Sequence, residues 1–92
     1  MGAQLEITLI GRQGCHLCLL AQDALAQVIA RFADEFPNTQ YSVNDLDVDS
    51  DPELLDAYSD EVPVLLINGQ QVAFLKIEPD RVFAKLVSLV DA

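Results

Sequence analysis

Gly14-Cys15-His16-Leu17-Cys18 carries both cysteines of the chain, three positions apart, where an apolar run gives way to a long helical pattern. A cysteine on the first turn of a helix faces unpaired backbone N–H groups and the positive end of the helix dipole. Both effects favour the thiolate over the thiol, and the thiolate is the reactive species. The placement of the pair therefore predicts a small dithiol oxidoreductase.

The totals of the chain limit its class. Its 92 residues suffice for one domain, residues 1–92, and are too few for two hydrophobic cores. About half of them, 51%, are hydrophobic, as in a globular chain. Fifteen acidic residues against five basic ones give a formal net charge of -10, which argues against nucleic acid as a partner. We interpret the acidity mainly as a solvated surface; the functional alternative is selection against acidic partners.

Residues 1–6 contain no basic segment and no long apolar stretch, so we expect no signal peptide. No apolar run approaches the roughly 20 residues of a membrane-spanning helix, and we expect no membrane partner. The expected compartment is the cytoplasm, which is reducing. In that setting a lone cysteine pair is catalytic or metal-binding more often than it is a structural disulfide.

A helix is predicted from residue 15 to about residue 35 by apolar side chains that recur every three or four positions. Cys18, Leu25 and Phe32 stand seven residues apart on one stripe, so we expect Cys18 to be shielded from solvent. Cys15 comes one turn earlier, at the open end of the helix. These positions predict that Cys15 attacks a substrate disulfide and that Cys18 resolves the mixed disulfide.

The rest of the chain alternates strand and helix patterns. Residues 4–10 are apolar on both faces, as in a central strand, and Asn68-Gly69 is a strong hairpin signal. The predicted elements are strand 4–10, helix 15–35, strand 41–48, a short helix from about 51, strands 62–67 and 70–75, and a last helix from about 78. A right-handed crossover makes the first two strands parallel. We therefore expect an α/β fold of βαβαββα order, with helices on both faces of a four-stranded mixed sheet.

Six acidic residues lie between positions 45 and 56, at a density that suggests a calcium loop. The segment lacks the glycine at loop position six and the glutamate at position twelve of an EF-hand. We interpret these residues as strand-end and helix-capping acids.

The C-x-x-C at a helix start, Val62-Pro63 at the start of the third strand and Asn68-Gly69 in the hairpin together resemble the glutaredoxin and thioredoxin superfamily. The likeness is greatest to small bacterial glutaredoxin-like proteins, whose active site also reads Gly-Cys-His-Leu-Cys, and it extends over nearly the whole chain. The resemblance implies a thioredoxin-like fold, thiol–disulfide oxidoreductase activity, a redox-active disulfide and a role in cell redox homeostasis.

The resemblance also implies roles for particular residues. Cys15 and Cys18 would be catalytic, and Gly14 belongs to the same motif. Pro63 would be cis and lie against the cysteines, while the Val62 backbone would hydrogen-bond an extended substrate.

Three residues around the cysteines each allow two interpretations. Arg12, three positions before Cys15, pairs with a substrate carboxylate or supports the thiolate, or it is one more surface charge. His16 stabilises the thiolate when it is charged, or it faces solvent without a role. Leu17 offers an apolar contact at the rim of the site, or it simply packs.

Glutathione is the co-substrate that the resemblance implies, but the chain departs from classical glutaredoxins where they hold it. Those proteins carry Gly-Gly-x-Asp after the hairpin, whereas residues 72–75 here have side chains at the glycine positions. The cations available for its two carboxylates are few, namely Arg12, Lys76 and Arg81. These departures count against glutathione. We expect no cofactor, a disulfide-containing protein or a small-molecule thiol as partner, and a monomer.

Two other functions remain open. Cys15 and Cys18 could supply two of the four ligands of a zinc or iron–sulfur site, with the others from a second subunit or from external thiols. A thioredoxin-like fold can also serve as a binding or adaptor module with little turnover. Failure to catalyse thiol–disulfide exchange faster than a free dithiol would favour the binding module.

Overall fold

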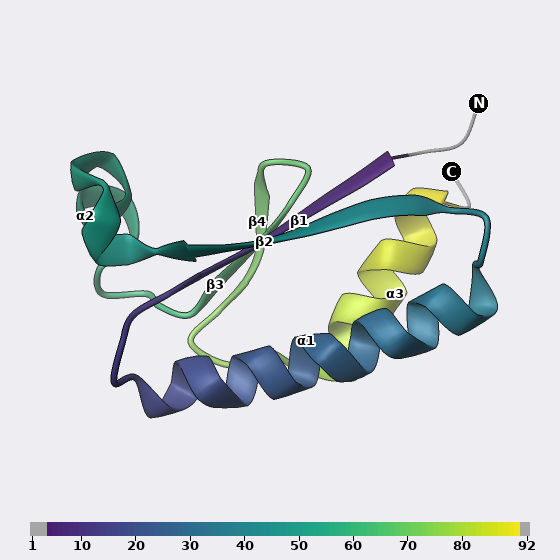
Figure 1. Cartoon of the computed structure of the whole chain (residues 1–92), viewed down its shortest axis with the longest axis horizontal. Helices are drawn as coiled ribbons and strands as arrows, with labels where there is room; N and C mark the ends of the chain where they lie inside the picture. The colour runs from purple at the N-terminus through teal and green to yellow at the C-terminus, as the bar shows by residue number, and fades with distance from the viewer. Residues whose placement is uncertain (1–3, 91–92) are drawn as a thin grey trace.

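The computed structural model describes residues 4–90 and has the α/β architecture that the sequence predicts (Figure 1). Its elements are β1 (Gln4–Gly11), α1 (His16–Glu35), β2 (Gln40–Asp47), the 3₁₀ helix η1 (Val48–Ser50), α2 (Pro52–Tyr58), β3 (Val64–Ile67), β4 (Gln70–Phe74) and α3 (Pro79–Val90). The expectation about a signal peptide falls partly on residues 1–3, which lie outside the described residues. Within residues 4–90, no helix is both long and apolar enough to cross a membrane.

The four strands form one mixed sheet in the order β2-β1-β3-β4. β1 pairs in parallel with β2 and antiparallel with β3, and β3 pairs antiparallel with β4. The crossover through α1 gives the parallel pair, and the predicted hairpin gives the β3–β4 pair. Asn68 and Gly69 both have positive φ, 53° and 80°, as a type I′ turn requires. The predicted βαβαββα order and mixed sheet are confirmed.

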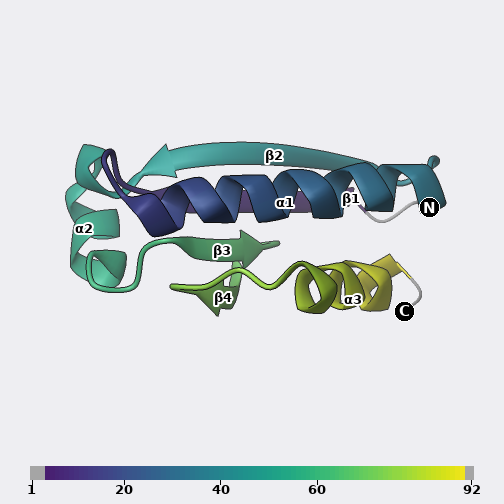
Figure 2. The same ribbon diagram turned by 90° about the horizontal axis from the view of Figure 1, so that it is seen from below.

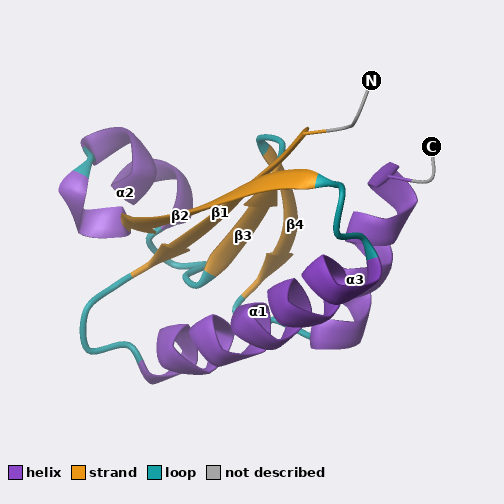
Figure 3. Cartoon of the chain, turned by 45° about the vertical axis from the view of Figure 1, so that its right-hand side comes forward, coloured by secondary structure: helices purple, strands orange, loops and turns teal. Residues whose placement is uncertain are grey.

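The larger hydrophobic core lies between one face of the sheet and the helices α1 and α3, which pack side by side (Figure 3). Alternate residues of β1, Leu5, Ile7 and Leu9, point into this core because successive side chains of a strand face opposite ways. α1 contributes Phe32, which is fully buried and whose ring stacks on Phe36 with centroids 5.1 Å apart. This packing fixes α1 along the sheet.

A smaller core lies on the opposite face, where β1 ends. Ile10, Val48 and Val64 form it, and α2 packs against it through Leu54. Helices therefore cover both faces, as predicted, but α2 lies at one end of the sheet (Figure 2) and Glu6, on the same face as Ile10, is exposed. The end of β1 is thus packed on both faces, and this end leads into the turn that carries the cysteines.

Predicted boundaries shift by one or two residues. The helix predicted from residue 15 begins at His16, because Cys15 is its N-cap. The strand predicted to reach Val48 ends at Asp47, since Val48 starts η1 and enters the smaller core. The third strand begins at Val64 rather than at residue 62.

Candidate active site

Cys15 is the N-cap of α1, with an extended backbone at φ -92° and ψ 114°. Its Sγ accepts a hydrogen bond from the backbone N–H of Cys18 at 3.1 Å. The sulfur therefore satisfies one of the N–H groups that every helix leaves unpaired at its start. A thiolate at this position would accept the same bond with a full negative charge, so the local structure favours the charged form.

The two cysteines differ in exposure as the helical periodicity predicts. Cys18 is 5% exposed, whereas Cys15 is only half-buried. They form a disulfide, with Cα atoms 5.2 Å apart. The pair can therefore change between disulfide and dithiol, a two-electron step, within one helical turn. Solvent reaches Cys15 more easily than Cys18.

The turn between β1 and α1 depends on two glycines. Gly14 has a φ of 74°, a left-handed conformation in which a side chain is strained. Gly11 lies against the buried cysteine, because a Cβ at this position would be 3.4 Å from both Cβ and Sγ of Cys18. The sequence identifies Gly14 through its motif, while the close approach of Gly11 to Cys18 becomes visible only in the fold.

A pocket of about 350 Å³ adjoins the cysteines, and we call it the Cys pocket. It is lined by Leu9, Gly11, Arg12, Gln13, Gly14, Cys15, Cys18, Leu19, Gln22, Asp45, Leu46 and Asp47. Four of the predicted site residues thus come together: Arg12, Gly14, Cys15 and Cys18.

The other predicted residues lie outside the lining of the Cys pocket. His16 and Leu17 are exposed on the first turn of α1, with Leu17 45% exposed. Val62 and Pro63 precede β3, a segment that Figures 1 and 2 place at the same end of the molecule as the start of α1. The Val62–Pro63 peptide bond is cis, and Pro63 is fully buried.

Arg12 has a partner that the sequence does not reveal. Its Nε and Nη2 donate to the two carboxylate oxygens of Asp49 at 3.0 and 3.2 Å, and Nη1 donates to the Ser59 carbonyl oxygen at 3.5 Å. The hydrogen bond to Asp49, followed by the charges of Asp49, Asp47 and Asp60, raises the pKa of Arg12. The guanidinium therefore ties the cysteine-bearing turn to η1 and to the end of α2.

Leu75, which directly follows β4, has a further unusual backbone conformation. Its φ of 63° is left-handed, which is uncommon for a residue with a branched side chain. Its N–H donates to the carbonyl oxygens of Pro63 at 2.8 Å and Glu61 at 3.2 Å. These bonds hold the conformation and connect the end of β4 to the proline segment.

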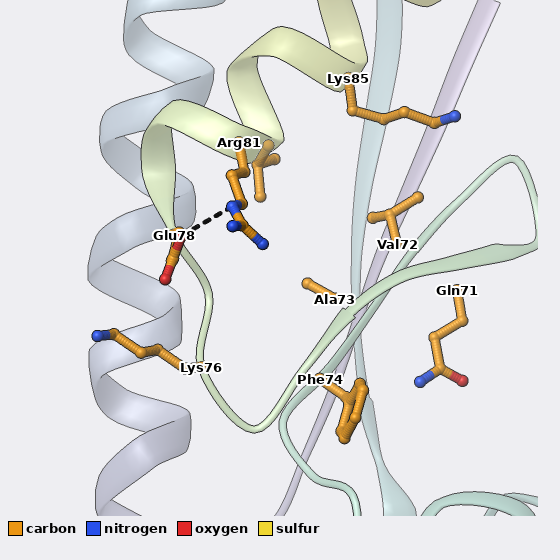
Figure 4. Close-up of a pocket in the computed structure, with 9 residues that line it drawn as sticks. Gln71, Val72, Ala73, Phe74, Lys76, Glu78, Arg81 and Lys85 are labelled. Carbon is orange, nitrogen blue, oxygen red and sulfur yellow. Dashed lines mark ion pairs between the residues drawn. The ribbon is translucent and has the colours of Figure 1, made fainter.

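A second, larger pocket of about 630 Å³ lies between β4 and α3 (Figure 4), and we call it the β4–α3 groove. It is lined by Gln71, Val72, Ala73, Phe74, Lys76, Glu78, Arg81, Val82 and Lys85. Glu78 pairs with Arg81 at 3.1 Å. The groove shares no lining residue with the Cys pocket. Of the three cations considered for glutathione, Arg12 is thus in one pocket while Lys76 and Arg81 are in the other.

Comparison with known proteins identifies the family. The Glutaredoxin-like domain (DUF836) matches residues 6–87, which is most of the chain. The chain belongs to this glutaredoxin-like family. It is also similar to a glutaredoxin-like protein of Dictyostelium discoideum, with 22% identity over 88 residues that cover 94% of this chain and 79% of that protein.

Solved structures support the same assignment. A structural-genomics target protein from X. campestris matches this glutaredoxin-like chain with a TM-score of 0.69 and 31% identity, over 89% of this chain and 96% of that one. Chloroplastic thioredoxin z shares the fold, with a TM-score of 0.68 at 19% identity over 96% of this chain and 79% of its own. The predicted superfamily and fold are confirmed, and a thioredoxin-like fold with a close Cys15–Cys18 pair supports a redox-type role.

The metal alternative would need ligands beyond the cysteine pair. Across the part of the chain that the structure describes, no group of three or more His, Cys, Asp or Glu side chains is placed to hold a metal ion. A site on Cys15 and Cys18 that a second subunit or external thiols complete stays a prediction from the sequence.

Proposed function

We propose that this glutaredoxin-like protein is a thiol–disulfide oxidoreductase in which Cys15 attacks and Cys18 resolves. The observation that carries the proposal is the N-cap position of Cys15, whose Sγ accepts the Cys18 N–H at 3.1 Å while Cys18 itself is buried. The half-buried sulfur is the more accessible of the two, which supports it as the attacking one, and the shielded sulfur is one turn away.

The proposed reaction has two thiol–disulfide exchange steps. The Cys15 thiolate attacks one sulfur of a substrate disulfide, forms a mixed disulfide and expels one substrate thiolate. The Cys18 thiolate then attacks Cys15 Sγ, closes the Cys15–Cys18 disulfide and expels the second substrate thiolate. The substrate gains two electrons and the protein loses two, so a thiol or dithiol donor must reduce the protein before the next turnover.

The surrounding residues have supporting roles in this proposal. Gly14 supplies the left-handed turn into α1, and exposed Leu17 offers an apolar contact to a partner. His16 stabilises the thiolate when it is charged. The Val62 backbone and Pro63 receive an extended segment of the substrate by strand-like pairing. In this proposal the partner is a disulfide-containing protein or a small-molecule thiol. The protein acts as a monomer, in the cytoplasm.

The test is a titration of the protein against glutathione redox buffers of graded potential. Samples are quenched with an alkylating agent and weighed by mass spectrometry. We expect one two-electron transition between dithiol and disulfide with a defined midpoint. In a Cys18→Ser variant, a glutathione adduct should accumulate on Cys15, since the resolving thiol is absent.

Other outcomes would replace the proposal. Cysteines that stay unreactive without any metal would favour a binding or adaptor module. Alkylation that is blocked until a chelator is added would favour a metal site that two subunits share.

A further inference from the structure

The walls of the Cys pocket carry an unbalanced negative charge. Asp45 and Asp47, both on β2, line it, and Arg12 is the only basic residue among the described residues that line it. Because Asp49 binds the Arg12 guanidinium through both carboxylate oxygens, that positive charge is already matched. Two acidic residues therefore line the pocket together with one basic residue, and that residue, Arg12, is bound through both oxygens of a third acid, Asp49, so the pocket with its immediate surroundings keeps a negative balance.

The sheet register explains why these acids line the same pocket as the cysteines. In the parallel pairing of β1 with β2, Asp45 stands opposite Leu9 and Asp47 opposite Gly11. Two residues apart on one strand, the acids share a face of the sheet. β1 runs from Gly11 directly into the turn that ends at Cys15, so the end of β2 flanks that turn.

The remaining basic residues lie in the β4–α3 groove or pair elsewhere, and His16 lies outside the lining of the Cys pocket. Lys76, Arg81 and Lys85 line the β4–α3 groove and not the Cys pocket. Arg31 pairs with Glu35 at 3.1 Å and lies over the Phe83 ring. With a net charge of -10, the rest of the chain adds to the field of the pocket instead of opposing it.

Building on the proposed function, we propose that the Cys pocket selects disulfides flanked by positively charged groups and disfavours disulfides flanked by carboxylates. A cationic group beside the scissile bond would lie between the carboxylates of Asp45 and Asp47 while the Cys15 thiolate attacks. An anionic group would meet both carboxylates and the thiolate, with Arg12 occupied by Asp49. The natural substrate is then a disulfide in a basic sequence or a small disulfide with ammonium groups.

A series of disulfides that are alike in size and differ in charge tests this directly. Cystamine carries two ammonium groups, 2-hydroxyethyl disulfide is neutral, and 3,3′-dithiodipropionate carries two carboxylates. Reduced protein is mixed with each, quenched with an alkylating agent and weighed, which gives the rate constant for oxidation of the dithiol. Each value is divided by that of free dithiothreitol with the same disulfide, so that differences in intrinsic reactivity cancel.

We expect the normalised rate constants to fall in the order cystamine, 2-hydroxyethyl disulfide, 3,3′-dithiodipropionate, with roughly tenfold between the first and the last at low salt. In 0.5 M salt, where the Debye length is only about 4 Å, the difference should shrink to about twofold. This salt titration needs only the wild-type protein.

A pair of variants separates local from overall charge. Asp45→Asn combined with Asp47→Asn removes the two carboxylates, and asparagine at 47 can still accept the Asp49 N–H bond. The matched control pairs Asp34→Asn with Asp56→Asn, two exposed acids outside the pocket lining. The pocket variant should lose most of the preference for cystamine, and the control should keep it.

The other outcomes overturn the inference in distinguishable ways. Equal normalised rate constants for the three disulfides would refute the charge preference and leave the oxidoreductase standing. A preference that both double variants reduce equally would assign it to the net charge of the chain and not to the pocket. Exchange no faster than free dithiothreitol with every disulfide would remove the proposed function itself, and the inference with it.

Discussion

The two pockets of this small protein have opposite charge. Among the described residues that line the Cys pocket, two are acidic and one is basic, and Asp49 binds the basic one, Arg12, through both carboxylate oxygens. The β4–α3 groove contains three of the five basic residues of the chain and one acid. Its lining therefore carries +2, and the rest of the chain carries -12. A strongly acidic composition thus conceals a separation of charge between the two pockets.

The largest difference between the pockets should be in how strongly their residues affect the rate of thiol–disulfide exchange. Cys15→Ser should lower thiol–disulfide exchange on the order of a thousandfold or more, to the uncatalysed level, since it removes the nucleophile. Lys85→Gln in the groove should change the rate by less than about twofold, because this exposed charge lines the other pocket and is screened by salt. The oxidation rate constant of each variant is measured with 2-hydroxyethyl disulfide by quenching with an alkylating agent and weighing the products. A large loss in Lys85→Gln would show that the two pockets are not independent.

The next largest effect on rate should come from Asp49, whose carboxylate binds the Arg12 guanidinium. Asp49→Asn keeps a hydrogen-bond acceptor but removes the charge that matches the guanidinium. We expect the rate with 3,3′-dithiodipropionate to rise about fivefold and the rate with cystamine to fall, because the pocket becomes less negative. Equal changes in the rate constants for the two disulfides would show that the Asp49–Arg12 ion pair does not set the charge preference. Glu53→Gln, on α2, is a control of equal charge change.

A smaller effect, on the free energy of unfolding, should come from the left-handed backbone positions near the two pockets. The left-handed position beside the Cys pocket is Gly14, with φ 74° and no atom within 4 Å of an added Cβ. Gly14→Ala should therefore cost about 1 kcal/mol of unfolding free energy through backbone strain alone, without a steric clash. Urea denaturation of the oxidised protein measures this. An unchanged midpoint would mean that the turn relaxes into another conformation.

The smallest effect should appear at the edge of the groove, where the left-handed residue is Leu75 instead of glycine. Asparagine tolerates this conformation better, so Leu75→Asn should raise the unfolding free energy by about 0.5 kcal/mol. Leu20→Asn, at a similarly exposed leucine within α1, should lower it by a comparable amount through helix propensity. The prediction fails if both substitutions destabilise the protein equally.

Sequence reasoning works well where a repeating pattern is set by the backbone. The helical period placed Cys18 on the buried stripe with Leu25 and Phe32, and the structure buries all three. Alternation and the Asn68-Gly69 signal likewise predicted the sheet, because strand periodicity and turn conformation depend on near neighbours.

What the sequence could not reveal depends on contacts between distant segments. Arg12 and Asp49 are 37 residues apart, and nothing local singles out Asp49 from the other acids of its run. The position of Asp45 beside the cysteines likewise follows from the register of β1 with β2. Leu75 gives no local signal at all, since leucine is an unusual choice for positive φ and long-range bonds to Pro63 and Glu61 hold it there.

The acids of β2 have a further consequence for how the molecule meets its own copies. β2 is an edge strand, and Tyr41, Val43 and Leu46 on it are all more than a third exposed. An unprotected apolar edge invites pairing with the same strand of another molecule. Two copies paired through β2 in parallel register, or antiparallel about residues 45–47, would bring Asp45 and Asp47 of both strands close together, and like charges disfavour these pairings. The acids that line the Cys pocket therefore also oppose these modes of edge-to-edge association.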